Sequence, residues 1–118
     1  MSRMTVEERD TATVMGSGDM PVLATPRMTA LMENAAMLAV AGELPDGSTT
    51  VGGHIDVSHI APTPVGAGVE ATAVLEKVEG RKLFFRVKAV QDGGVVIGEG
   101  THLRFVVDRL RFMGKVGK

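Results

Sequence analysis

The chain has 118 residues and no cysteine, and its 13 Lys and Arg nearly balance its 14 Asp and Glu, for a formal net charge of −1. This length predicts a single domain over residues 1–118 with a sizeable core. The near-neutral charge gives no global field for nucleic acid or an anionic membrane. The lack of cysteine excludes disulfides, a thiolate nucleophile and Cys-ligated zinc.

The composition and the first residues also narrow the location and the partners. Residues 1–10 lack the apolar run of a signal peptide, and no stretch of roughly 18 apolar residues follows. We therefore expect a cytoplasmic protein without a membrane segment. Aromatic residues make up 3% of the chain, with no Trp or Tyr, which argues against stacking platforms for nucleic-acid bases.

The chain opens with a segment whose β character increases along its length. Residues 4–15, ending in Thr-Ala-Thr-Val-Met, predict a first strand at an edge of a sheet. The segment 16–21, Gly-Ser-Gly-Asp-Met-Pro, predicts a flexible loop that leads towards the next element.

Residues 25–42 form the longest stretch without strand character, and we predict one helix there around which a sheet wraps. Thr25 is suited to cap the first amides and Pro26 fits the first helical position, while Gly42 is a plausible stop. At 100° per residue, the helix has one apolar stripe that consists of Met28, Met32, Ala35, Ala36 and Ala39.

Glu33 lies at the shoulder of this stripe, between its apolar and polar edges. A carboxylate at such a position either loses part of its hydration or reaches a partner. Most Glu side chains point into water, so helix position alone favours a solvated side chain. Glu33 is nevertheless the first residue in the chain that we consider for chemistry.

Residues 49–61 alternate in the manner of a strand that follows a turn at residues 45–48. His59 falls on the apolar face, which is the face expected to meet the helix. A lone His on such a face is more often a satisfied core residue than a functional one, and both interpretations remain open at this point. The apolar face carries Ile55, Val57, His59 and Ala61, and the polar face carries His54, Asp56 and Ser58.

Three further strands are predicted, with a break at residues 63–68 and hairpin turns at residues 79–82 and 91–94. The strands cover residues 69–76, 83–89 and 95–107. Leu83, Phe85, Val87 and Ala89 are expected to face inward, and the last strand has Leu103, Phe105 and Val107 on one face and His102, Arg104 and Val106 on the other. The tail, residues 108–118, is expected to fray at its end and carries Arg109, Arg111, Lys115 and Lys118.

The order of strand, long helix and about four antiparallel strands predicts an α+β domain with one helix on one face of an antiparallel sheet. A single sheet of this size leaves its edges partly uncovered, so we expect pairing with a second copy of the chain.

This layout is that of the hotdog fold, and particular residues narrow the resemblance further. Over residues 22–107 the chain resembles the fluoroacetyl-CoA thioesterase family of hotdog thioesterases. The resemblance rests on Ala24-Thr25, Leu31-Met32-Glu33, Gly52 seven residues before His59, Thr-Pro-Val-Gly at 63–66, Val-Glu-Gly-Arg at 78–81 and Gly-Glu-Gly-Thr-His-Leu-Arg at 98–104.

The resemblance implies catalytic roles for Thr25, Glu33 and His59, and substrate contacts for Gly52 and Arg104. Glu33 is then a nucleophile or a general base for water, His59 an acid/base partner and Thr25 a hydroxyl donor that positions the substrate. The Gly52 amide would lie close to the thioester carbonyl, and the positive end of the helix suits an oxyanion.

The resemblance also implies a homodimer with its sites at the subunit interface, in which Gly52 serves a site whose Thr25 and Glu33 belong to the partner chain. No metal or cofactor is implied. The substrate of the family is an acyl-CoA. Five basic residues are candidates to hold the CoA phosphates, although any one of them is more often simply solvated: Arg81, Lys82, Arg86, Arg109 and Lys115.

The family member that selects fluoroacetyl-CoA carries aromatic residues before the helix, whereas residues 16–23 of this chain contain none. We therefore expect hydrolysis of a short or medium acyl-CoA to the free acid and CoA. Two alternatives stay open. One is a non-catalytic hotdog protein that binds acyl-CoA or a small ligand, and the other is a hotdog hydratase or dehydratase, whose expected Asp and His pair is not evident here.

Overall fold

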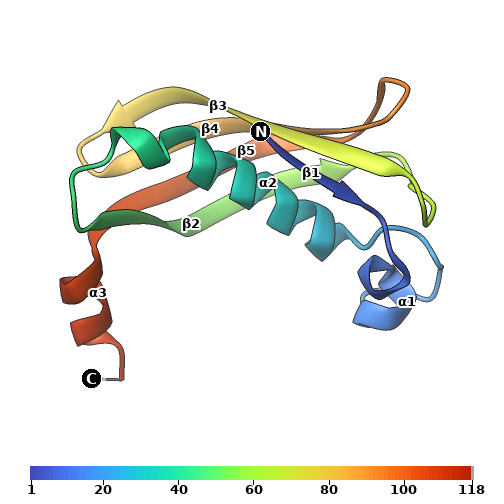
Figure 1. Cartoon of the computed structure of the whole chain (residues 1–118), viewed down its shortest axis with the longest axis horizontal. Coiled ribbons are helices and arrows are strands. Elements are labelled where there is room, and N and C mark those ends of the chain that lie inside the picture. The colour runs from blue at the N-terminus through green and yellow to red at the C-terminus, as the bar shows by residue number, and fades with distance from the viewer. Residues whose placement is uncertain (118) are drawn as a thin grey trace.

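The computed structural model describes residues 1–117, and its five strands form one curved antiparallel sheet in the order β1-β3-β4-β5-β2. Figure 1 shows the long helix α2 crossing one face of this sheet. The strands are β1 (Ser2–Thr5), β2 (Ser48–His59), β3 (Gly68–Glu79), β4 (Lys82–Gln91) and β5 (Val95–Asp108). The helical segments are η1 (Glu8–Asp10), α1 (Ala12–Met15), α2 (Thr25–Val40), η2 (Ala41–Glu43) and α3 (Arg109–Lys115).

The predicted helix is confirmed, with two corrections at its ends. Ala24, not Thr25, is the N-cap residue, and its methyl side chain cannot make a cap bond. Thr25 is already helical, and its hydroxyl bonds His59 instead. Pro26 lies in the first turn, as expected. The helix ends at Val40, and the predicted stop, Gly42, lies inside the short 3₁₀ turn η2 that follows.

The apolar stripe of α2 packs on the sheet almost as predicted. Met28, Met32, Ala35 and Ala36 are fully buried in the core. Ala39 is exposed, because its single methyl group in the last turn does not reach the sheet, whereas the larger side chain of Val40 does. The inward-facing residues predicted for β4 are all buried, namely Leu83, Phe85, Val87 and Ala89.

The prediction of a strand over residues 4–15 was wrong beyond Thr5, where η1 and α1 replace it. Local bonds between side chains and backbone explain the difference. The Glu7 amide donates to Asp10 Oδ2 at 2.9 Å, and the Val14 amide donates to Thr11 Oγ1 at 3.4 Å. Such bonds compete with a sheet ladder for the same backbone groups.

The last strand buries its polar face. His102 and Arg104 are only 3% and 7% exposed and face α2, whereas Leu103 and Phe105 on the other face are half-buried. β5 lies between β4 and β2, and β2 has a register shift between Gly52 and His54 where it pairs with β5. The sequence pattern did not show which face of β5 meets the helix. It is the face with His102 and Arg104, and this face forms part of the site.

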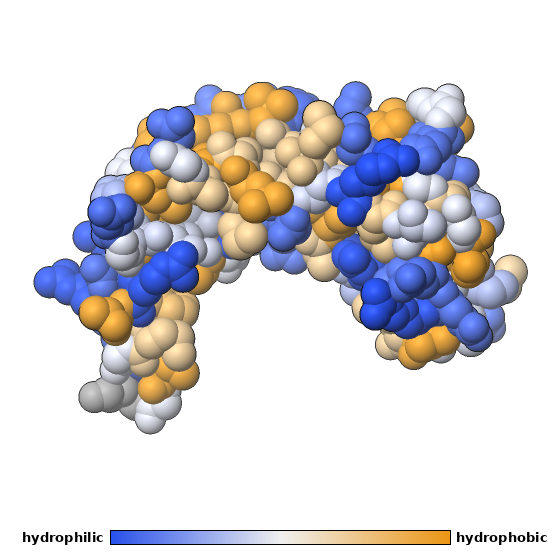
Figure 2. All heavy atoms as spheres, viewed as in Figure 1, coloured by the Kyte–Doolittle hydropathy of each residue, from blue (hydrophilic) through white to orange (hydrophobic). Residues whose placement is uncertain are grey.

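The tail forms the helix α3, where the Arg111 amide donates to Asp108 Oδ1 at 3.0 Å. Lys118, which was counted among the basic tail residues, lies outside the described residues. In Figure 2 the molecule is an arch, hollowed between the projecting α3 at one end and the segment around α1 at the other. None of the helices within residues 1–117 is long and apolar enough to cross a membrane.

Candidate active site

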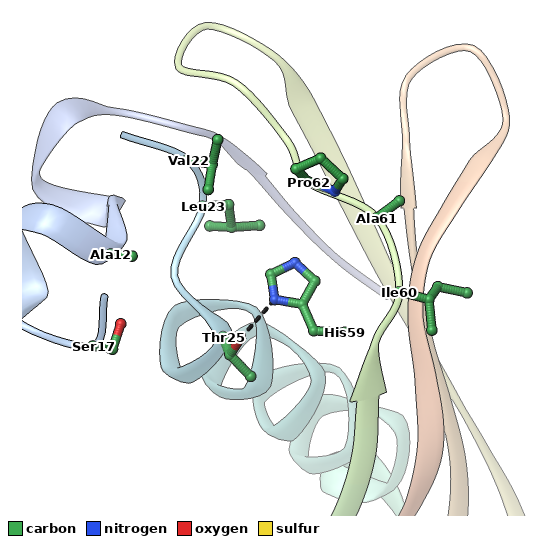
Figure 3. Close-up of a pocket in the computed structure, with 9 residues that line it drawn as sticks. All are labelled: Ala12, Ser17, Val22, Leu23, Thr25, His59, Ile60, Ala61 and Pro62. Carbon is green, nitrogen blue, oxygen red and sulfur yellow. Dashed lines mark hydrogen bonds between the residues drawn. The ribbon is translucent and has the colours of Figure 1, made fainter. Parts of the chain in front are cut away.

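The first turn of α2 meets the end of β2 through one short hydrogen bond. Thr25, the first residue of the helix, and His59, the last residue of the strand, are joined through Oγ1 and Nδ1 at 2.7 Å. Figure 3 shows the two side chains pointing at each other. The helix start and the strand end thus place a hydroxyl on an imidazole, although the residues are 34 positions apart.

A pocket of about 280 Å³ opens beside this pair. Its walls come from the segment before α2 and from the segment after β2, and they include Val22, Leu23, Ile60 and Pro62. Apolar walls around two convergent polar groups are typical of ligand pockets. The pocket therefore suits an apolar group next to a polar reacting centre.

The His59 ring is held in its neutral form. Burial lowers the pKa of His59 below its usual value, and the backbone of Ala61 offsets only part of this shift. The ring atom Nε2 is buried and makes no hydrogen bond of good geometry with any residue from 1 to 117. The neutral imidazole can therefore exchange a proton with the Thr25 hydroxyl through Nδ1.

Glu33 lies two turns farther along α2, half-exposed, and faces the strand β2 at Gly52. A β-carbon added to Gly52 would lie 3.1 Å from Glu33 Oε2, 3.4 Å from His102 Cε1 and 3.5 Å from Arg104 Nη1. Gly52 thus leaves open the space in which a carboxylate from α2 approaches two side chains of β5. Glu33 and Gly52 meet within one chain, so this contact needs no partner subunit.

Arg104 is fixed by three hydrogen bonds. Its Nε donates to Thr50 Oγ1 at 2.9 Å and its Nη2 donates to the Thr50 carbonyl at 3.0 Å. Its Nη1 donates to His102 Nε2 at 3.1 Å. Burial lowers the pKa of Arg104, and the charge of Glu33 acts in the opposite direction. The guanidinium is thus a rigid positive group near the Glu33 carboxylate.

His102 supports Arg104 in a defined tautomer. Because a guanidinium can only donate, His102 Nε2 accepts from it, and the ring proton lies on Nδ1. Nδ1 then donates to the His54 carbonyl at 2.7 Å. Burial lowers the pKa of His102, and the nearby positive charge of Arg104 adds to this effect. The ring is therefore a neutral acceptor for Arg104.

Sequence reasoning did not include His102 among the site residues. The signal that could have found it is its position on the same face as Arg104, two residues earlier on the same strand. Two basic side chains that are buried on one strand face need hydrogen-bond partners, and each is placed to serve the other.

The structure thus brings the predicted residues together in two groups. Thr25 lies with His59, and Glu33 lies with Gly52 and Arg104. Along the helix the groups are about 12 Å apart, from a rise of 1.5 Å per residue. Within residues 1–117 no ion pair joins Glu33 to His59, and no cluster of His, Asp and Glu there is arranged to hold a metal ion.

Comparison with known proteins identifies relatives of this site and fold. The model of a family described as fluoroacetyl-CoA-specific thioesterase matches residues 6–110. A fluoroacetyl-CoA thioesterase of Streptantibioticus cattleyicolor is 46% identical over 95 residues, which are 80% of this chain and 68% of that protein.

Solved structures of similar fold support the same relationship. A mutant of the fluoroacetyl-CoA-specific thioesterase FlK, in complex with fluoroacetate and CoA, matches with a TM-score of 0.88 and 38% identity, over 97% of this chain and 93% of that chain. A hot-dog-like protein from Thermanaerovibrio acidaminovorans matches with a TM-score of 0.83 and 26% identity, over 98% of this chain and 88% of that chain. These matches confirm the predicted hotdog fold, and the chain belongs to the fluoroacetyl-CoA-specific thioesterase family.

Proposed function

We propose that the protein hydrolyses a short or medium acyl-CoA thioester to the free acid and CoA. Hydrolysis of acyl-CoA thioesters is the activity of the family to which the chain belongs. The observation that carries the proposal for this chain is the Thr25–His59 pair at an apolar pocket. The pocket segment 16–23 contains no aromatic residue, which favours a general acyl group over a fluorinated one.

The reaction requires attack on the carbonyl carbon, cleavage of the C–S bond and a proton for the departing thiolate. Glu33 supplies the carboxylate that attacks the carbonyl or activates water. His59, neutral at rest, takes up the proton that the attacking water loses and returns it through the Thr25 hydroxyl to the departing CoA sulfur. Thr25 also positions the thioester. Glu33 Oε2 lies at Gly52, and rotation of this half-exposed side chain towards the helix N-terminus would bring the carboxylate nearer to Thr25.

The carbonyl oxygen needs positive potential as it becomes an oxyanion. The N-terminus of α2 supplies a positive dipole end beside Thr25. In this proposal the partner's Gly52 amide lies close to the carbonyl, as the resemblance implies, and Arg104 holds a fixed positive charge beside the Glu33 carboxylate. No metal or cofactor takes part in these steps.

The proposal includes a homodimer formed along β2. This strand has 12 residues and forms one edge of the sheet. A long open edge is a template for pairing with another strand, and a two-fold axis would pair two β2 strands antiparallel and join the two sheets. Light scattering on the purified protein tests this, and a monomer at micromolar concentration would contradict it.

Release of free thiol from a panel of acyl-CoA substrates tests the activity, with Glu33→Gln as the inactive counterpart. Tight binding without release would indicate the alternative, a non-catalytic acyl-CoA binding protein. Hydration of an enoyl-CoA without release would indicate a hydratase. A cytoplasmic location is part of the proposal, in keeping with a CoA-linked substrate, and cell fractionation tests it.

A further inference from the structure

The helix α3 exposes an apolar surface that nothing within residues 1–117 covers. Leu110 is 87% exposed and Met113 is 62% exposed, and Phe112 and Val116 are 40% and 59% exposed. Figure 1 shows α3 leaving the end of β5 and projecting away from the sheet. So many large apolar side chains on one short segment indicate a surface that contacts another molecule.

A second set of exposed apolar side chains lies on and near α1, which borders the Thr25–His59 pocket through Ala12. Val14 and Met15 on α1 are 57% and 44% exposed, Met20 in the next loop is 62% exposed, and Ile60 after β2 is 57% exposed. Ile60 also lines the pocket itself. The segment around α1, which borders the pocket through Ala12, and α3 lie at opposite ends of the arch (Figures 1 and 2).

The pairing register connects these two patches across a dimer. Ser48, the first residue of β2, pairs with Asp108, directly before α3, whereas His59 at the other end of β2 pairs with Gly98. The two ends of β2 are roughly 36 Å apart, from a rise of 3.3 Å per residue. Antiparallel pairing of two β2 strands places the Ser48 end of one protomer beside the His59 end of the other.

We propose that α3 of one protomer covers the mouth of the Thr25–His59 pocket of its partner. Leu110, Phe112 and Met113 would pack on the apolar patch of the partner, which comprises the partner's Val14, Met15, Met20 and Ile60. This inference rests on the homodimer proposed above and adds a residue set that completes each pocket in trans.

Charge and composition support this assignment. The cations of α3 are Arg109, Arg111 and Lys115, and the exposed segment around α1 carries Glu8 and Asp19, while Glu7 pairs with Arg9 at 2.7 Å. The apolar walls of the pocket contain no Phe, Tyr or Trp, and Phe112 would supply one. A cover of this kind excludes water from the acyl group and confines its length.

Cross-linking tests the contact without reference to activity. Because the chain has no native cysteine, the double variant Met15→Cys/Met113→Cys carries only the designed pair. A short bis-maleimide should join two chains in this variant and leave each single variant uncross-linked. The two positions lie at opposite ends of the arch within one chain, so the link can form only between chains.

The matched control is Met113→Cys/Val78→Cys, because Val78 is 58% exposed on β3, away from the pocket. Selective linking of the Met15 pair supports the proposal. Equal linking of both pairs would overturn it, and so would a dimer in light scattering with no link. A monomer would overturn both the cover and the dimer, while thiol release by the unmodified protein still decides the proposed function separately.

A second measurement covers the case in which the cysteine variants do not fold. Leu110→Ser/Phe112→Ser should lower kcat/KM for acyl-CoA about tenfold, the equivalent of losing one packed apolar side chain, while the dimer persists. Val78→Ser should leave kcat/KM unchanged. An unchanged kcat/KM in the folded α3 variant would show that α3 does not cover the pocket.

Discussion

The carboxylate of Glu33 lies directly over Gly52: a β-carbon at Gly52 would come within 3.1 Å of Oε2. A contact this short requires the carboxylate to move by a few tenths of an ångström. The obstacle is the far end of a flexible side chain, so the backbone need not shift. The consequence should therefore appear in activity more than in stability.

Gly52→Ala should lower kcat/KM for acyl-CoA by about tenfold or more, because a small misplacement of a catalytic group is costly. The melting temperature should fall by only a few degrees, in line with a loss of about 1 kcal/mol or less. Gly42→Ala is the matched control, since an added β-carbon there meets nothing within 4 Å. Full activity in Gly52→Ala would remove this contact from the mechanism.

Glu33→Gln should lower thiol release by about 100-fold or more, because the amide neither attacks a carbonyl nor takes a proton from water. The change keeps the size of the side chain, so circular dichroism and the melting temperature should stay close to those of the unmodified protein. Glu43→Gln alters an exposed Glu in η2 and should have no effect on release. Near-normal thiol release in Glu33→Gln would show that the Glu33 carboxylate takes no part in the reaction.

Much of this arrangement could be predicted from local sequence signals, and the reason differs from element to element. Pro26 and the apolar spacing of residues 28–36 act within α2, so the helix could be placed without knowledge of the sheet. Strict alternation fixed the inward side chains of β4 in the same way. Residues 8–15 could not be placed, because bonds from Asp10 and Thr11 to the backbone outweigh β propensity there.

The site itself depends on contacts that sequence periodicity does not contain. Thr25 and His59 stood out as a helix start and as a His on an apolar strand face, and family resemblance gave them catalytic roles. Their hydrogen bond joins residues 34 positions apart. The burial of Arg104 contradicts the usual exposure of charged residues, and it is possible because Thr50 and His102 satisfy the guanidinium. These are tertiary relationships that only the assembled sheet defines.

The acid dependence of activity should follow His59. Burial lowers the pKa of this ring, so the neutral form that bonds Thr25 predominates at neutral pH and is lost only when the pH falls below about 6.5. The rate of thiol release should therefore be flat around neutrality and fall in acid, with a midpoint below about 6.5. Rates measured from about pH 5 to 8 check this, and a midpoint at or above about 6.5 would contradict it.

His59→Ala should lower turnover by about 100-fold or more, as expected for the loss of an acid/base group. Thr25→Ser keeps the hydroxyl that bonds His59 Nδ1 and should retain most activity, whereas Thr25→Val removes it and should lose activity. Circular dichroism establishes that the variants fold. Equal rates in the Ser and Val variants would show that the hydroxyl has no part in the reaction.

Stability against acid should depend in part on His102. Burial lowers its pKa in the folded protein, so between that value and about 6.5 the unfolded chain binds more protons than the folded one. The contribution of neutral His102 to the free energy of unfolding is then fully present above about pH 6.5 and decreases as the pH falls through this window. Urea denaturation at a series of pH values measures the slope.

His102→Gln removes the titrating group and replaces Nε2 with a side-chain oxygen that can accept from Arg104 Nη1. The slope of unfolding free energy against pH should therefore be shallower in this variant, with a modest loss of stability at neutral pH. His54→Gln changes an exposed ring, whose backbone carbonyl still accepts from His102, and should keep the original slope. A neutral, buried His102 must take up a proton when the protein unfolds in acid, and this uptake produces the slope. If the slope in His102→Gln matched that of the unmodified protein, the acid sensitivity would have to come from other groups.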